Sequence, residues 1–221
     1  MTGAALFDLD GTLVDTAPDF IVVLNAQRMA HGQEPLPEQA IRDTVSDGAR
    51  ALIRLAFGGE PGEPRFEQLR QELLDRYEDE VGKAATLFDG FDEVLRELEQ
   101  RHIPWGIVTN KPRLYTELLL ERMGLQARCA VTICPDDVAQ SKPDPEGLLL
   151  ACRHLSCNPR QSIYLGDHER DIAAGRAAAM RTIAARYGYI ADKRNVSTWQ
   201  ADHIIDHGSE CRPLFDAHLF R

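Results

Sequence analysis

Two aspartates, Asp8 and Asp10, follow a short apolar run over residues 4–7 in the sequence Asp-Leu-Asp-Gly-Thr. The run predicts a short buried strand, and Gly11 supplies the backbone freedom that a tight turn after it requires. Open α/β sheets bind their ligands at the carboxyl ends of their strands. Since alternate residues of an extended chain share a face, one aspartate could attack a substrate atom while the other carries protons. Taken alone, Asp-x-Asp is also common in surface turns.

A hydroxyl and an amide follow a second apolar stretch. Residues 103–108 predict a strand, and Thr109 and Asn110 come directly after it. Their side chains, together with nearby backbone N–H groups, offer hydrogen-bond donors to an anion. In isolation such a pair is more often part of an ordinary turn.

A lysine lies between turn-forming residues just before a predicted helix. Lys142 precedes Pro-Asp-Pro, in which Asp144 is a suitable N-cap and Pro145 suits the first helical position. A helix N-terminus carries a positive partial charge, so an ammonium held there would favour a bound anion. A surface lysine in a loop is the alternative, but the flanking prolines favour a positioned residue.

A second pair of carboxylates follows another predicted strand, residues 162–165. Asp167 comes directly after Gly166, and Asp171 lies four residues further on, one helical turn away. Carboxylate oxygens are the ligands that Mg²⁺ takes in proteins, commonly with several waters and a substrate phosphate. By itself the pattern also fits a helix with an acidic N-cap.

Strands and helices alternate from residue 87 onward. Such alternation predicts a mostly parallel, Rossmann-like sheet with helices on both faces. Gly124 would end one of the helices. The expected strands are 103–108, 130–134, 162–165, 182–185 and 203–206, and the expected helices are 91–98, 114–123, 145–155, 172–180 and a C-terminal one.

Residues 18–81 show helical patterns and no convincing strand. Phe66, Leu69, Leu73 and Tyr77 recur at helical spacing with charges between them, which predicts an amphipathic helix. We therefore expect an all-helical insertion after the first strand. The predicted organisation is a discontinuous α/β core, residues 1–15 and 87–221, and a helical domain, residues 16–86.

Composition narrows the class of protein. The chain has 221 residues and a formal net charge of −10, which argues against nucleic acid or an acidic membrane surface as partner. No apolar run approaches a membrane span, and residues 1–20 lack the pattern of a signal peptide, so we expect a cytoplasmic protein. Five cysteines without a Cys-x-x-Cys pair argue against a disulfide framework or a structural zinc site.

Taken together, Asp-x-Asp, Thr, Lys and Asp-x₃-Asp at four strand ends resemble the haloacid dehalogenase superfamily across essentially the whole chain. The resemblance implies that Asp8 attacks phosphorus and forms an aspartyl phosphate, while Asp10 is the general acid and base. It also implies that Thr109 and Asn110 bind the phosphoryl oxygens and that Lys142 offsets their charge and orients the nucleophile.

The same resemblance implies a magnesium site. Mg²⁺ would be held by the Asp8 carboxylate, the main-chain carbonyl of Asp10 and the Asp167 carboxylate, with Asp171 bound directly or through water. An aspartate at position 10 is typical of the phosphatases and phosphomutases of this superfamily. At position 168 the family often has Asp or Ser, whereas this chain has His168.

The helical insertion resembles the cap of the phosphoglycolate phosphatase and β-phosphoglucomutase branch, which closes over the site. Residues 46–50 resemble the cap loop that enters the active site in phosphoglycolate phosphatases. This makes Arg50 a candidate for binding a substrate carboxylate, and a solvated arginine on a helix is the alternative.

The runs 105–112, 133–136 and 186–190, together with Trp199, are similar to phosphatases of N-acetylmuramic acid 6-phosphate, which serve cell-wall sugar recycling. We therefore expect a Mg²⁺-dependent phosphatase for a small carboxylate-bearing phosphate monoester, either N-acetylmuramate 6-phosphate or 2-phosphoglycolate. A sugar phosphomutase of the β-phosphoglucomutase type and a non-catalytic regulatory protein are the alternatives. The expected partner is a small phosphorylated metabolite, and the expected state is a monomer or homodimer.

Overall fold

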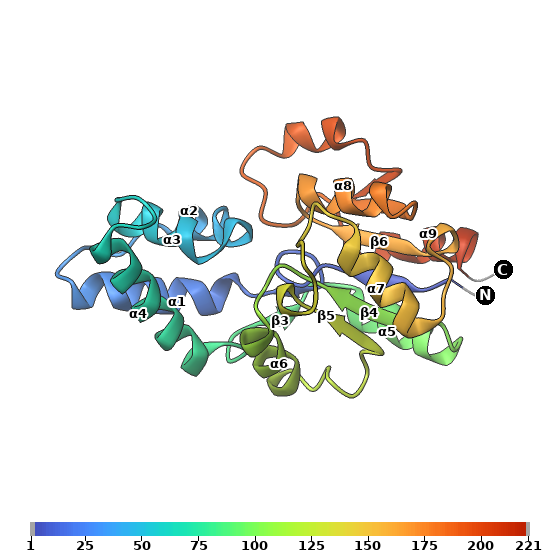
Figure 1. Ribbon diagram of the computed structural model, residues 1–221, viewed down its shortest axis with the longest axis horizontal. Helices are drawn as coiled ribbons and strands as arrows, with labels where there is room; N and C mark the ends of the chain where they lie inside the picture. The colour runs from blue at the N-terminus through green and yellow to red at the C-terminus, as the bar shows by residue number, and fades with distance from the viewer. Residues whose placement is uncertain (1–2, 220–221) are drawn as a thin grey trace.

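A six-stranded parallel sheet forms the centre of the molecule in the computed structural model, which describes residues 3–219 (Figure 1). All five neighbouring pairs of strands are parallel. Such a sheet with helical connections is the α/β architecture that the alternating pattern predicts. In spatial order the strands are β5 (Val131–Ile133), β4 (Trp105–Val108), β1 (Ala5–Phe7), β6 (Ile163–Gly166), β7 (Arg181–Ala185) and β8 (His203–Ile205).

The central strand β1 pairs with β4 on one side and β6 on the other, so that Phe7 lies opposite Ile107 and Leu165. The chain order runs outward from β1 through β4 to β5 and then returns to β6. Ligands of open α/β sheets bind at such a reversal, beyond the carboxyl ends of the strands. The first residues beyond β1, β4 and β6 are Asp8, Thr109 and Asp167.

Helices cover both faces of the sheet, as predicted. Alternate strand residues divide between two apolar clusters, with Phe7 in one and Leu6 in the other. Phe7 packs edge-to-face against Phe91 and Phe215. The Phe7 cluster includes side chains of α5 (Phe91–Gln100), α6 (Arg113–Arg122) and α9 (Cys211–His218), and the Leu6 cluster those of α7 (Glu146–Leu155) and α8 (Glu169–Ala177).

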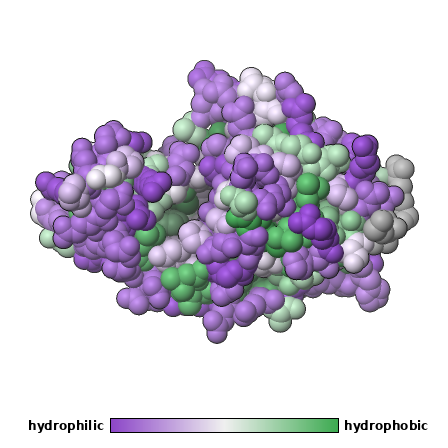
Figure 2. All heavy atoms as spheres, in the orientation of Figure 1, coloured by the Kyte–Doolittle hydropathy of each residue, from purple (hydrophilic) through white to green (hydrophobic). Residues whose placement is uncertain are grey.

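Four helices lie together to one side of the sheet (Figure 1). The chain enters and leaves this helical segment through two short antiparallel strands, β2 (Val14–Asp15) and β3 (Thr86–Leu87). The division into a core and a cap domain at these residues stays a prediction. The face in Figure 2 is largely hydrophilic and is hollowed between the helical segment and the sheet half. The four helices are α1 (Ala17–Ala30), α2 (Glu38–Arg42), α3 (Gly48–Phe57) and α4 (Pro64–Glu80).

Two helix starts differ from the sequence prediction. Pro145, not Asp144, is the N-cap of α7, and Asp144 Oδ1 accepts a hydrogen bond from the Glu146 N–H at 2.9 Å. Helix α8 begins at Glu169, three residues early, because His168 and Asp171 form a capping box that satisfies its first N–H groups. The capping box also fixes the backbone between the two predicted metal ligands.

No helix within residues 3–219 is long and apolar enough to cross a membrane. Short turns of 3-10 helix join the longer elements. The 3-10 turns are η1 (Val45–Asp47), η2 (Pro135–Asp137), η3 (Pro159–Gln161), η4 (Lys193–Trp199) and η5 (Gly208–Glu210).

Candidate active site

Three buried carboxylates gather at the carboxyl edge of the sheet. Asp8, Asp167 and Asp171 each place a carboxylate oxygen within 4.8 Å of the others. Burial raises the pKa of Asp8, and burial with repulsion from Asp8 and Asp171 raises the pKa of Asp167 to about 7. These shifts reflect negative charge that the protein alone compensates only in part. The donor set, all hard oxygens, fits a divalent cation such as Mg²⁺.

Lys142 is the cation of this cluster. Its Nζ lies 2.8 Å from Asp8 Oδ1 and 2.7 Å from Asp171 Oδ1, and it donates to the Tyr164 hydroxyl at 2.8 Å. The lysine side chain is only 2% exposed. Burial works against its charge, yet the two carboxylates outweigh that effect and raise the pKa of Lys142. The positioned lysine predicted from the flanking prolines therefore lies against the predicted nucleophile.

The other predicted metal ligands are held by neighbouring groups. Asp167 accepts hydrogen bonds from the hydroxyls of Thr12 (3.0 Å) and Ser46 (2.9 Å) and from the Tyr189 N–H (3.0 Å). Gly11 has φ +78°, and a Cβ there would meet Asp167 Oδ2 at 2.3 Å. A glycine is thus required at this turn for two reasons, backbone conformation and space.

Asp171 has both carboxylate oxygens engaged by the protein. Oδ2 accepts the His168 N–H at 3.0 Å, and Oδ1 is the atom that pairs with Lys142. His168, the departure from the family pattern, contributes its main-chain N–H and also caps α8. Binding of a cation through water would keep both of these contacts.

In the described part of the chain, one carboxylate oxygen of Asp10 accepts hydrogen bonds and the other accepts none. Oδ1 accepts hydrogen bonds from Thr16 Oγ1 at 2.5 Å and from Lys111 Nζ at 2.9 Å. No residue between 3 and 219 donates a hydrogen bond to Oδ2, and Asp10 lines the site cavity. This arrangement suits a group that exchanges a proton with a substrate or water.

Lys111 is a site residue that the sequence analysis did not assign. Its Nζ donates to the Tyr77 hydroxyl at 2.7 Å and lies 4.7 Å and 5.3 Å from the ring centres of Tyr77 and Phe20. The lysine therefore connects Asp10 to the helical segment. The sequence does place Lys111 directly after Asn110, beyond the end of β4. Residues at that position lie close to the carboxyl edge of the sheet, so its position could have indicated a site residue.

The predicted phosphate-binding pair is at the site, with one difference. Thr109 and Asn110 both line the cavity. The Asn110 amide, however, donates to the Lys142 carbonyl (3.1 Å) and accepts the Lys142 N–H (3.2 Å). These bonds show that Asn110 supports the lysine loop, and its predicted contact with the phosphoryl group stays a prediction.

Arg50 is not among the residues that line the cavity. Gly48 and Ala49, at the start of α3, face it, whereas Arg50 is exposed. Successive helical residues point about 100° apart, so the residue after Ala49 turns away from the site. In this structure Arg50 therefore lies away from the cavity, as in the alternative of a solvated arginine, and its contact with the substrate stays a prediction. Arg70 and Arg170 line the cavity instead.

The cavity has a volume of about 320 Å³ and lies between the carboxyl edge and the helical segment. Its far wall is a single face of α4, with Arg70, Leu74 and Tyr77 at helical spacing. Tyr115 and Phe20 extend this wall, and Phe20 stacks on Tyr77 with ring centres 4.0 Å apart. The cavity thus combines an acidic floor with an aromatic wall that carries a positive charge.

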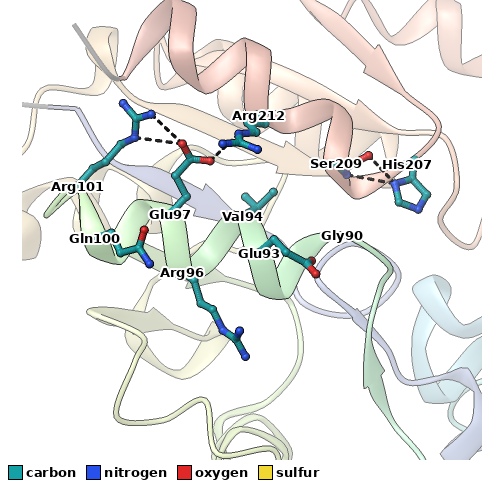
Figure 3. Close-up of a pocket in the computed structure, with 10 residues that line it drawn as sticks. All are labelled: Gly90, Glu93, Val94, Arg96, Glu97, Gln100, Arg101, His207, Ser209 and Arg212. Carbon is teal, nitrogen blue, oxygen red and sulfur yellow. Dashed lines mark hydrogen bonds and ion pairs between the residues drawn. The ribbon is translucent and has the colours of Figure 1, made fainter.

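A larger groove, of about 740 Å³, lies elsewhere, along α5 and η5 (Figure 3). Glu97 stands between Arg101 and Arg212 there and pairs with both at 2.8 Å. None of the three clustered aspartates borders this groove. Size alone would favour it, but the smaller cavity contains the groups that can carry out chemistry.

Comparisons with known proteins establish the family of the chain. The family model for haloacid dehalogenase-like hydrolases matches residues 5–185, and the chain belongs to that family. It is 48% identical over 216 residues to an N-acetylmuramic acid 6-phosphate phosphatase of Pseudomonas aeruginosa, covering 98% of this chain and 96% of that protein. It is 43% identical over 203 residues to a phosphoglycolate phosphatase of Xanthomonas campestris, covering 92% and 91%. The predicted class, a phosphoric monoester hydrolase, is confirmed.

A solved structure supports the fold. The crystal structure of a predicted phosphoglycolate phosphatase from Haemophilus somnus superimposes with a TM-score of 0.83 at 22% identity and covers 96% of this chain and 97% of that one. At this identity the likeness concerns the fold alone. The expected α/β core with helices on both faces is confirmed.

Proposed function

We propose that the protein is a Mg²⁺-dependent phosphatase that hydrolyses a small carboxylate-bearing phosphate monoester through an aspartyl-phosphate intermediate, with N-acetylmuramate 6-phosphate as the preferred substrate. The observation that carries the proposal is the placement of Asp8 against Lys142 and the carboxylate cluster, at the floor of the cavity. Asp8, Asp167 and the Asp10 carbonyl would hold the ion, with Asp171 behind them. When bound, the ion would offset the repulsion between Asp8 and the anionic phosphoryl group.

The chain's own residues divide the reaction between them. Oδ1 of Asp8 accepts from the Leu9 N–H and pairs with Lys142, which leaves Oδ2 to attack phosphorus. The P–O bond to the leaving group breaks, and Asp10 donates a proton to the departing alkoxide. Asp10 then takes a proton from the water that attacks phosphorus, which releases inorganic phosphate and restores Asp8. Thr109 is placed to bind a phosphoryl oxygen throughout.

The shape of the cavity favours a sugar over a two-carbon acid. A volume of about 320 Å³ is at the low end of the range for pockets that hold drug-sized ligands. Tyr115, which is half-buried on this wall, offers an aromatic surface against which a sugar ring could pack, and 2-phosphoglycolate would leave this wall uncovered. The relative with 48% identity is named for N-acetylmuramic acid 6-phosphate, which agrees with this choice.

Phosphate release from a panel of esters tests the proposal. N-acetylmuramate 6-phosphate, 2-phosphoglycolate and neutral hexose 6-phosphates should be compared by kcat/KM under one set of conditions. We expect the first to be the best substrate. Preference for a neutral hexose phosphate would overturn the proposed substrate class.

The arginines that the sequence offered for a phosphomutase do not line the cavity. Three arginines of the helical segment between β2 and β3, here called the cap segment, were candidate donors to a second phosphate. Each bonds elsewhere and none lines the cavity: Arg28 bonds to the Glu34 carbonyl, Arg42 to Asp15 and Arg54 to Glu60. Phosphate release without an added sugar bisphosphate would separate a phosphatase from a mutase.

Removal of divalent cations should stop turnover. The three carboxylates cannot approach a phosphoryl dianion without a compensating charge, so EDTA should abolish activity and Mg²⁺ should restore it. Ca²⁺ should substitute poorly, because its longer and looser coordination would misplace Asp8. The measurement is phosphate release before chelation, after chelation and after each cation is added. Full activity in thoroughly chelated enzyme would contradict the metal assignment.

The change Asp10→Asn should affect substrates according to their leaving groups. A sugar alkoxide needs a proton as it leaves, so turnover of a sugar phosphate should fall by about 10²- to 10⁴-fold. An activated aryl phosphate such as p-nitrophenyl phosphate leaves unprotonated and should lose less in its first step. Burst-phase measurement of p-nitrophenol separates that step from hydrolysis of the intermediate. Equal loss in the burst with both substrates would exclude Asp10 as the acid.

A further inference from the structure

Three basic side chains line the site cavity, and their charges are compensated differently. Lys111 pairs with Asp10 at 2.9 Å, and Arg70 donates from Nε to Glu67 at 2.7 Å. Within residues 3–219, Arg170 has no carboxylate oxygen within 4.0 Å of its guanidinium nitrogens; its one side-chain hydrogen bond goes to a main-chain carbonyl. Of the three, Arg170 is therefore the one without a direct carboxylate partner in the described part of the chain.

Arg170 lies where the cap segment meets the start of α8. Its Nη2 donates to the main-chain oxygen of Ser46 at 2.5 Å, across 124 positions of the chain. The hydroxyl of the same Ser46 donates to Asp167 at 2.9 Å. Ser46 is thus held both by the Arg170 guanidinium and by Asp167 of the acid cluster. The guanidinium therefore lies where the carboxylate cluster and the cap segment meet.

The Nε–H of Arg170 is buried and has no hydrogen-bond partner in the described part of the chain. An unpaired buried donor is unfavourable, and more so when it is charged, so such a group calls for an explanation. Arg170 lines the cavity, and a carboxylate is the ligand that matches a guanidinium best, because its two oxygens accept from the planar group and its charge is opposite.

We infer that Arg170 binds the carboxylate of the substrate, the task that the sequence pattern suggested for Arg50. The inference rests on the proposed function, since it requires a substrate that carries a carboxylate apart from its phosphate. Because the same guanidinium binds the Ser46 carbonyl, a bound carboxylate would also help to keep the cap loop over the site.

A matched pair of substrates isolates this contact. N-acetylmuramate 6-phosphate and N-acetylglucosamine 6-phosphate differ by the lactyl ether that carries the carboxylate. For Arg170→Gln, kcat/KM for the first should fall about 10- to 100-fold more than for the second, as expected for hydrogen bonds to a charged group. Arg170→Lys, which keeps the charge but not the planar fork, should lose an intermediate amount.

Two control variants make the test specific. Arg176 lies on the same helix, is exposed and bonds to Gln200, so Arg176→Gln should not change the discrimination between the two esters. Arg50→Gln should likewise leave it unchanged, because Arg50 is outside the cavity. Loss of discrimination in Arg50→Gln but not in Arg170→Gln would overturn the inference. Turnover of p-nitrophenyl phosphate, which has no carboxylate, reports whether each variant is folded.

The two proposals fail in distinguishable ways. If the unaltered enzyme shows no preference for the carboxylated ester, the proposed substrate class is wrong, and the role of Arg170 falls with it. If the enzyme prefers the carboxylated ester and Arg170→Gln loses both esters equally, only the inference about Arg170 is wrong.

Discussion

Replacement of Asp8 by asparagine should lower turnover by at least about 10³-fold, in line with the loss of other enzymic nucleophiles. An amide nitrogen cannot attack phosphorus, so no aspartyl phosphate can form. The asparagine Oδ1 can still accept from the Leu9 N–H and from Lys142, as Asp8 Oδ1 does at 2.8 Å in both cases. The local geometry should therefore survive the change.

Stability separates a chemical from a structural effect of this change. Burial raises the pKa of Asp8, which means that its charge is unfavourable in the fold without a cation. Asp8→Asn removes that charge, so its melting temperature without Mg²⁺ should equal or exceed that of the parent. Phosphate release and thermal unfolding should be measured on one preparation. Turnover within tenfold of the parent would exclude Asp8 as the nucleophile.

Replacement of Lys142 by methionine should damage both stability and catalysis. The side chain is buried, and its Nζ pairs with Asp8 and Asp171. Removing one partner of a buried ion pair typically costs about 3–5 kcal/mol, because it leaves uncompensated charge in the interior. Loss of a charge that stabilises the transition state should also lower kcat by at least about 10²-fold.

A surface lysine supplies the control for Lys142→Met. Lys83 is 54% exposed and pairs with Glu80, so Lys83→Met should change the free energy of unfolding by less than about 1 kcal/mol. Added Mg²⁺ should restore part of the stability that Lys142→Met loses, because the ion places positive charge among the same carboxylates. Urea unfolding with and without Mg²⁺ measures both effects. A loss no larger than that of Lys83→Met would show that Lys142 does not hold the acid cluster together.

Local patterns were sufficient for the sheet and for the floor of the site. Short apolar runs followed by polar residues mark strands and their carboxyl ends, and parallel strands bring those ends to one edge. Asp8, Thr109 and Asp167 therefore meet although about 160 positions separate the first from the last. Asp167 and Asp171 are four residues apart, so a single helical turn is enough to bring both carboxylates to the site.

Tertiary packing decided the wall of the site. Which arginine faces the cavity depends on the rotation of α3 and on how the cap segment lies against α8, and these follow from contacts between residues far apart in the chain. The bond between Arg170 and Ser46 spans 124 positions, and that between Lys111 and Tyr77 spans 34. A helical pattern shows which face is apolar but not which polar neighbour an adjoining element will bring, so Arg50 and Arg170 could be told apart only in the folded chain.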